Sequence, residues 1–272
     1  FKNHAGIDTM AQTGNSFSSG WNNTGIGDKD ATYLFPLRRL SLFAKPVQAV
    51  KISVGSMAPE YGVGSENTYL DVDGYVMGYR ANISFGNRYG SKDVLATTYG
   101  FVGDFNKPSV FQRWGRMTNT TYGQLLFTKS FSEEIKATLA YEHILLVNYA
   151  RAAAKIDVKK QTEIIDSVTL ETMDRIDMNL SSTIHAVRLG KRLDKAIISK
   201  DLQIDTTFIS RMKNFNLQVG DKVFSRLSGR LTFTLPELYT SNIVKLGIFL
   251  DHVQSFTWTE KFRSELGLSL RF

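Results

Sequence analysis

The feature that most constrains this chain is a period-two alternation of apolar and polar residues that persists through long segments. Near the carboxyl end, Leu266, Leu268 and Leu270 alternate with polar or small residues. This pattern is typical of a β-strand with one apolar and one polar face. The longest apolar runs, such as residues 246–250, are about five residues long, whereas a transmembrane helix needs about 20. We therefore expect an all-β fold and no transmembrane helix.

Alternation of the same kind predicts strands along most of the chain. The clearest segments are 74–86, 93–105, 135–149, 222–235, 244–258 and 262–272, and the weaker ones are 38–45, 49–57, 119–130, 164–180, 183–193 and 197–210. Together they predict about twelve strands, with no convincing helix between them.

The connections between these segments fall into two classes. Short ones are expected at 45–48, 86–92, 130–134 and 193–196, and long polar ones at 59–73, 106–118 and 150–163. This asymmetry is typical of an up-and-down barrel in an outer membrane, with tight turns on the periplasmic side. A turn at 45–48 would place one more strand within residues 1–36. An even strand number would then need a further strand, so we expect about twelve strands, with fourteen as the alternative.

An apolar face can meet either a second sheet or lipid, so two architectures remain open. A soluble β-sandwich would also alternate, with its apolar faces turned inward. Many predicted strands, however, reach the roughly 9 to 11 residues that a tilted strand needs to cross hydrocarbon. Aromatic residues also stand at the ends of apolar faces, as Tyr75 and Phe85 do. We therefore predict a transmembrane antiparallel up-and-down β-barrel over residues 37–272, preceded by an N-terminal segment, residues 1–36, that forms a plug, a loop or the first strand.

The chain resembles a Gram-negative outer-membrane β-barrel at its carboxyl end. Its last alternating residues are Leu266, Leu268, Leu270 and Phe272. An alternating strand that ends in phenylalanine is similar to the C-terminal strand by which that superfamily is recognised for membrane insertion. Within the superfamily, residues 38–55 and 68–75 resemble the alginate-export type of porin. The resemblance implies a porin-like barrel in the outer membrane of a Gram-negative bacterium, and we carry no substrate over from it.

If the apolar faces point outward, basic residues outnumber acidic ones on the inward faces. The residues predicted to line the pore are Arg80, Lys136, Arg188, Arg192, Arg226, Arg230, Lys245 and Arg263. Those expected near mid-strand, where they would form a charged constriction, are Arg80, Arg188, Arg226, Arg230 and Lys245. A low-dielectric wall focuses the field of uncompensated charge, so such a lumen should attract anions. We predict a channel for passive diffusion of small hydrophilic solutes with a mild anion preference. The alternative is a non-conducting barrel that acts as a membrane anchor or as an interaction subunit of a larger envelope assembly.

The sequence contains few residues that could form an enzyme active site or bind a metal ion. The chain has no cysteine and only four histidines, none at the spacing of a zinc-binding helix, so we expect no metal and no other cofactor. A lipid-facing hydrolase would need a histidine beside a serine. None of His143, His185 and His252 has a serine at the next outward position of its strand, so we predict no enzymatic activity.

Other ligands and partners follow from the same inspection. The net charge of +7 is spread along the chain, so we expect no nucleic-acid partner. Gly62 and Gly64 begin a nucleotide-binding pattern that Asn67 interrupts, and Glu66, Asp71 and Asp73 lack the full spacing of a calcium loop. The expected partners are outer-membrane lipid and small hydrophilic, anionic solutes, with an oligomer or envelope-complex partner left open.

Overall fold

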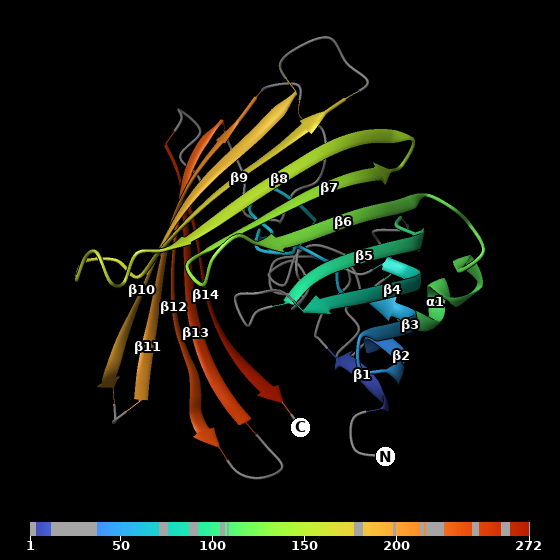
Figure 1. Ribbon diagram of the computed structural model, residues 1–272, viewed down its shortest axis with the longest axis horizontal. Helices are drawn as coiled ribbons and strands as arrows, with labels where there is room; N and C mark the ends of the chain where they lie inside the picture. The colour runs from blue at the N-terminus through green and yellow to red at the C-terminus, as the bar shows by residue number, and fades with distance from the viewer. Residues whose placement is uncertain are drawn as a thin grey trace, which may run out of the picture.

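The computed structural model shows one sheet that curls on itself (Figure 1). It describes residues 4–11, 37–70, 76–86, 92–103, 107, 109–176, 182–197, 200–212, 215, 226–240, 245–256 and 262–271, and the structural statements below concern these residues. Among them, no helix is long and apolar enough to cross a membrane.

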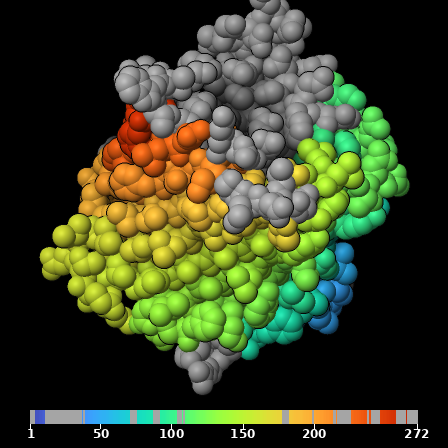
Figure 2. All heavy atoms as spheres, turned by 90° about the horizontal axis from the view of Figure 1, so that it is seen from above, coloured from blue at the N-terminus to red at the C-terminus, as the bar shows by residue number. Residues whose placement is uncertain are grey.

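The sheet has 14 strands, and each strand pairs antiparallel with the next one along the chain. The strands are β1 (Ala5–Ala11), β2 (Leu37–Val47), β3 (Val50–Met57), β4 (Val76–Gly86), β5 (Lys92–Phe101), β6 (Tyr122–Ser130), β7 (Ile135–Ile144), β8 (Val147–Asp157), β9 (Ser167–Arg175), β10 (Thr183–Ile197), β11 (Lys200–Arg211), β12 (Leu227–Thr240), β13 (Lys245–Ser255) and β14 (Phe262–Arg271). A short helix α1 (Val110–Arg113) and a 3-10 turn η1 (Trp114–Arg116) lie between β5 and β6. In Figure 2 the colours run from green through yellow to orange across one face, as this strand order requires. The predicted all-β, antiparallel up-and-down arrangement is thus confirmed, with the larger of the two expected strand numbers.

The two edges of the sheet are β1 and β14. β1 lies upstream of residue 37 and pairs with β2, from Ala5 opposite Ala44 to Ala11 opposite Leu37. Within the described residues, β1 and β14 do not pair with each other, so the sheet is not closed. Because the strand number is even, the chain enters β1 and leaves β14 at the same end of the sheet.

The two ends of the sheet differ in the length of their connections. We call the end where β2 joins β3 the turn end, and the opposite end the loop end. The turn end holds the connections 48–49, 87–91, 131–134, 158–166, 198–199 and 241–244, and the loop end holds 12–36, 58–75, 102–121, 145–146, 176–182, 212–226 and 256–261. The expected segregation of short and long connections is present with two exceptions: 145–146 is short on the loop side, and 158–166 is long on the turn side.

The largest error of the sequence analysis concerns residues 135–149, predicted as one strand. They form β7 and the start of β8, joined by Leu145 and Leu146. These leucines have φ values of 50° and 71°, the left-handed conformation that a two-residue type I′ turn requires and that Asn-Gly usually supplies. The sequence signalled the turn only by the loss of alternation at Ile144 and Leu146. The long connection predicted at 150–163 is wrong for the same reason, because β8 occupies it as far as Asp157.

The two faces of the sheet have the polarity opposite to that of a soluble protein. Apolar side chains are exposed on the convex side, Leu139 at 65% and Leu125 at 53%. On the concave side, polar side chains such as those of Glu142 and Arg151 are buried. Further exposed apolar residues of the strands include Ile7, Leu42, Ile52, Tyr79, Phe85, Tyr99, Phe127, Leu170, Val187, Phe208 and Leu250. A soluble sheet would bury its apolar face, so this outer belt lacks the partner that its composition demands.

At the loop end, the concave side is filled by an apolar cluster that we call the apolar cap. Tyr69, Leu70 and Phe215 come from connections and pack on inward side chains of the strands. Val102, directly after β5, also belongs to the cluster, and the strand members are Val76, Tyr122, Ile144, Tyr149, Met173, Ile184, Ala186 and Ile209. The apolar cap therefore joins the wall from β4 to β11.

Replacing the turn leucines by Asn-Gly is expected to stabilise the β7–β8 hairpin. A left-handed conformation costs an ordinary L-residue roughly 1–2 kcal/mol. We expect the variant Leu145→Asn/Leu146→Gly to raise the free energy of unfolding, measured in urea, by about 1 kcal/mol. The control Leu146→Ala keeps the left-handed backbone and should gain nothing. Equal stability of the Asn-Gly variant and the wild type would contradict the strained turn.

Candidate functional site

Residues 58–70 leave β3 at the loop end and turn into the concave side of the sheet, and we call them the inward loop. The sequence analysis expected a polar connection at 59–73 but gave no indication that it would fold inward. Side chains of several strands hold the inward loop: those of Arg80, Gln124, Thr138, Arg151, Glu171 and Arg230. The lumen of the curled sheet is therefore narrowed by a segment of the chain itself.

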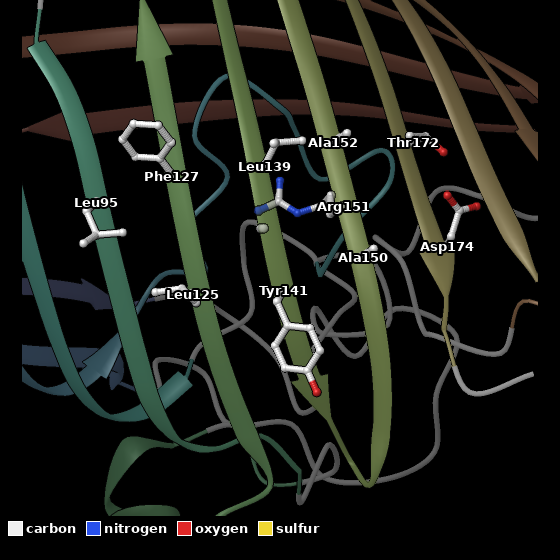
Figure 3. A pocket seen from close by; sticks show the side chains of 11 residues that line it. Leu95, Leu125, Phe127, Leu139, Tyr141, Ala150, Arg151, Ala152, Thr172 and Asp174 are labelled. Atoms are coloured by element: carbon white, nitrogen blue, oxygen red, sulfur yellow. The ribbon is translucent and has the colours of Figure 1, made fainter.

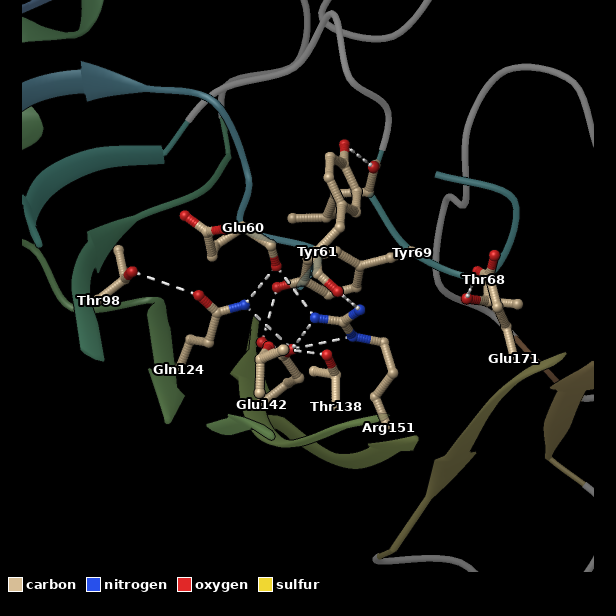
Figure 4. A network of polar contacts seen from close by, with 12 residues as sticks. Glu60, Tyr61, Thr68, Tyr69, Thr98, Gln124, Thr138, Glu142, Arg151 and Glu171 are labelled. Atoms are coloured by element: carbon tan, nitrogen blue, oxygen red, sulfur yellow. Dashed lines mark hydrogen bonds and ion pairs between the residues drawn. The ribbon is translucent and has the colours of Figure 1, made fainter. Parts of the chain in front are cut away.

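Arg151 of β8 is the centre of these contacts (Figure 4). Its guanidinium donates to the carbonyl oxygens of Tyr61 at 2.8 Å and Glu60 at 3.0 Å. It also pairs with the carboxylate of Glu142 on β7 at 3.2 Å, and both side chains are at most 1% exposed. Gln124 of β6 donates to the same Glu60 carbonyl at 2.9 Å and to Glu142 at 3.1 Å. A buried charge is tolerated only when it is paired and hydrogen-bonded, so the inward loop completes the site that it occupies.

Tyr69 links this ion pair to the apolar cap. Its hydroxyl donates to Glu142 Oε2 at 2.7 Å, and the Tyr122 hydroxyl lies 2.5 Å from the Tyr69 oxygen. The Arg151 guanidinium also lies over the Tyr69 ring, 4.5 Å from its centroid. Burial, together with the Glu142 carboxylate, raises the pKa of the Tyr69 hydroxyl well above its usual value, so it stays a donor.

Two further side chains hold the second half of the inward loop. Glu171 of β9 accepts hydrogen bonds from the Ser65 backbone N–H at 2.9 Å and the Thr68 hydroxyl at 3.0 Å. Arg230 of β12 pairs with Glu66 of the loop at 2.5 Å and with Asp251 of β13 at 2.7 Å. The loop is thus fixed to walls on both sides of the lumen.

Close approach of the loop to β7 explains Gly62. Its φ is +64°, and a Cβ atom there would lie 2.3 Å from Thr138 Oγ1. The adjacent Val63 N–H donates to that same hydroxyl at 3.0 Å. The sequence analysis considered Gly62 and Gly64 as the start of a nucleotide-binding pattern. In the structure both lie in the inward loop, and the left-handed backbone of Gly62 lets the loop pass close to β7.

Between the inward loop and the wall of β10–β12 lies a cavity of about 300 Å³. It is lined by Tyr61, Gly64, Ser65, Glu66 and Asn67 from the loop and by Arg188, Asp205, Thr207, Arg230 and Thr232 from the wall. At about 30 Å³ per water, its volume corresponds to about ten water molecules. The lining is polar and carries charges of both signs, which suits a hydrophilic solute.

Three of the predicted pore-lining residues lie at this site. Arg80 donates to the Ala58 carbonyl at 2.7 Å and lies 3.6 Å from the Glu60 carboxylate, and Arg230 is paired as described above. Arg188 and Asp205 line the cavity, and neither has an ion pair within the described residues. Glu60 and Glu66 of the inward loop thus compensate the charges of Arg80 and Arg230. The sequence analysis did not count these two acids among the inward charges.

The other predicted residues lie away from the cavity. Lys136 is opposite Ser130 and Lys155 near the turn end. Arg192 is exposed at the turn end and pairs with Asp201. Arg226 is exposed and precedes β12, so its prediction as a mid-strand residue is wrong. Lys245 begins β13 opposite Arg271, which also excludes a mid-strand position, and Arg263 stands opposite Val253 in β14. The side chains of Lys245 and Arg263 lie outside the described part of the structure.

Sequence reasoning missed Arg151 and Glu171. Arg151 fell within the predicted connection 150–163, and the turn at residues 145–146 reversed the face assignment of Tyr149. The sequence did contain a weak sign of β8, because Tyr149, Arg151 and Ala153 alternate with alanines. Alanine on both faces made the alternation hard to recognise. Asp71 and Asp73, weighed as calcium ligands, lie outside the described residues, and within those residues no group of three acidic or imidazole side chains could hold a metal ion.

The convex wall carries a depression of about 420 Å³ over β5–β9 (Figure 3). Leu95, Leu125, Phe127 and Leu139 form its rim, and Ala150 and Ala152 of β8 form part of its floor. A neighbouring depression of about 430 Å³ continues it towards β10. Small side chains on β8 thus leave a furrow in the apolar belt.

One pair on the convex side bears on the hydrolase alternative. His252 of β13 and Ser264 of β14 are cross-strand partners, with His252 Nδ1 2.8 Å from Ser264 Oγ. The sequence analysis compared neighbours along one strand and so did not find this pair across two strands. Hydrolysis also needs donors for an oxyanion, but the backbone N–H groups of β13 beside His252 already serve the ladders with β12 and β14. We interpret the pair as a cross-strand hydrogen bond, and the absence of enzymatic activity stays a prediction.

Comparison with known families and with curated proteins gives no match for this chain. Its function therefore has to be argued from the site itself.

Breaking the buried ion pair is expected to destabilise the protein far more than breaking an exposed one. Arg151→Met leaves the buried Glu142 without its cation, which costs roughly 3–5 kcal/mol. The control Arg192→Met removes a side chain that is 62% exposed, and it should cost about 0–1 kcal/mol. Urea unfolding in detergent micelles measures both losses. The double variant Arg151→Met/Glu142→Met should recover part of the loss, and equal losses for the two arginines would refute the role of the pair.

Proposed function

We propose that this chain forms a closed β-barrel in the outer membrane of a Gram-negative bacterium and conducts small hydrophilic solutes through its lumen. The observation that carries the proposal is the inverted polarity of the sheet, apolar and exposed outside, polar and buried inside. Lipid is the partner that such a convex face fits, and water and ions are the partners that such a concave face fits.

Closure follows from the same solvent argument. An open sheet edge in hydrocarbon would leave backbone N–H and C=O groups without partners, at several kcal/mol each. β1 and β14 run in opposite directions, so they can pair antiparallel like every other neighbouring pair. The long connections at the loop end and the short ones at the turn end also correspond to the outer and periplasmic sides of such barrels.

The cavity beside the inward loop is the proposed path of solutes. Arg188 and Asp205 both line this cavity without an ion pair in the described residues, so their charges offset each other. The mild anion preference is therefore proposed from the excess of basic residues that the sequence places on the inward faces. The proposed partners remain outer-membrane lipid and small hydrophilic, anionic solutes.

The inward loop and the apolar cap favour a second candidate function. Together they fill much of the concave side from β4 to β11, which suits a non-conducting barrel that anchors or joins a larger envelope assembly. Conductance separates the two candidates.

Closure is testable by cross-linking because the chain has no cysteine. A cysteine in place of Ile7 on β1, combined in turn with Leu266→Cys, Leu268→Cys or Leu270→Cys on β14, should form a disulfide after folding in micelles. Strand neighbours in a sheet bring paired Cβ atoms to about 4.5–5.5 Å, close enough for oxidation. The control pairs Ile7→Cys with Leu139→Cys on the distant β7 and should not cross-link. Absence of a disulfide in all three β14 combinations would contradict a closed barrel.

Conductance and its ion preference test the channel. In planar bilayers with a KCl gradient, the reversal potential of the wild type should show preference for Cl⁻, which weakens as salt rises and screening shortens the reach of fixed charge. Arg188→Glu should move the preference towards K⁺, whereas Arg192→Glu, at the exposed turn end, should move it less. A folded protein without conductance would favour the anchor, and equal shifts for the two variants would place the path elsewhere.

A further inference from the structure

The segment that holds α1 and η1 packs on the convex side of the sheet, outside the lumen. Val110 of α1 is buried in a cluster with Met77 of β4 and Phe101 of β5, and Leu40 and Met117 pack against the same cluster. Met77 and Phe101 are opposite each other and share the outward face with Tyr79 and Tyr99 by strand periodicity. Figure 1 shows α1 beside the ends of β3 and β4. The segment therefore covers the apolar belt at the loop end.

Its opposite side presents a second apolar surface. Phe111 is 67% exposed and Trp114 is 45% exposed. The segment is held in one shape by a capping box between Ser109 and Gln112 and by the hydrogen bond from Arg113 to the Gly103 carbonyl at 3.2 Å. A short helix that is apolar on both sides needs an apolar partner on the side away from the protein.

The charge of the segment narrows the choice of that partner. Between Phe105 and Thr121 the sequence contains Lys107, Arg113 and Arg116 and no acidic residue. Arg113 is buried, so Lys107 and Arg116 are the cations of the segment that can meet an external partner. Aromatic rings flanked by basic side chains are the composition of membrane interfaces, where the rings lie at headgroup level and the cations meet anionic lipid.

We propose that the α1–η1 segment is an interfacial anchor that binds anionic, phosphate-bearing lipid of the leaflet at the loop end, with Phe111 and Trp114 inserted at headgroup depth. This inference rests on the proposed membrane span. It fixes the depth of the barrel, because the anchor is packed against β4 and β5 at a defined height. It also identifies the loop end as the place where the protein recognises the lipid headgroup.

Tryptophan fluorescence tests the anchor. Trp21→Phe/Trp258→Phe leaves Trp114 as the single tryptophan. After folding into vesicles of phosphatidylcholine and phosphatidylglycerol, Trp114 emission should shift to the blue, lose its quenching by iodide, and be quenched by lipids brominated near the headgroup. Phe111→Ser in this background should restore part of the iodide quenching. Arg116→Gln should do so in the mixed vesicles and have less effect in phosphatidylcholine alone.

Two reference probes separate the anchor from the membrane span. In a background with all three tryptophans replaced by phenylalanine, Leu139→Trp reports the outer belt and Lys160→Trp reports the water-exposed turn end. One result would overturn the anchor and leave the proposed function intact: iodide fails to quench Leu139→Trp but quenches Trp114 as strongly as it quenches Lys160→Trp. Iodide access to all three probes would overturn both. Shielding of Trp114 in phosphatidylcholine vesicles equal to that in anionic vesicles would overturn the recognition of anionic lipid.

Discussion

The structure depends on the buried pair between Arg151 and Glu142. Neither charge could stay inside the curled sheet alone, because removing an ion from water costs several kcal/mol unless partners replace its hydration. The partners are the carbonyl oxygens of the inward loop, the Gln124 amide and the Tyr69 hydroxyl. The ion pair therefore draws residues 58–70 into the lumen, and the loop in turn places Glu66 beside Arg230 and Tyr69 within the apolar cap.

The two sides of the sheet face different solvents, and this constraint accounts for most of the architecture. Outside, an apolar belt that includes Leu125 and Leu139 is exposed, and the α1–η1 segment covers part of it near β4 and β5. Inside, polar side chains of several described strands satisfy one another or the inward loop. The result reverses the usual arrangement of a soluble sheet, which is why we propose lipid outside and a hydrated lumen inside.

The alternation predicted the strands and their faces where it was unbroken. Arg80, Arg188 and Arg230 were expected on the inner side and lie there. The prediction failed at Leu145 and Leu146, because a left-handed turn made of two leucines has none of the usual turn chemistry. That one turn hid β8, and with it Arg151, the residue on which the site is centred. Arg226 and Lys245 were misplaced for a simpler reason, since strand boundaries are less well defined by periodicity than strand faces.

The sequence by itself determined the all-β class, the antiparallel meander and the apolar side of the strands whose alternation is unbroken, because period two is a local property of the extended backbone. Only the tertiary structure decided what fills the concave side. The inward loop contains Glu60, Glu66, Asn67 and two glycines, and nothing local distinguishes it from a connection in water. Its place depends on Arg80, Arg151, Glu171 and Arg230, which come from strands far apart in the chain. Which cations of the lumen are neutralised therefore depends on which residues meet in space. Counting the predicted inward charges along the sequence could not show this.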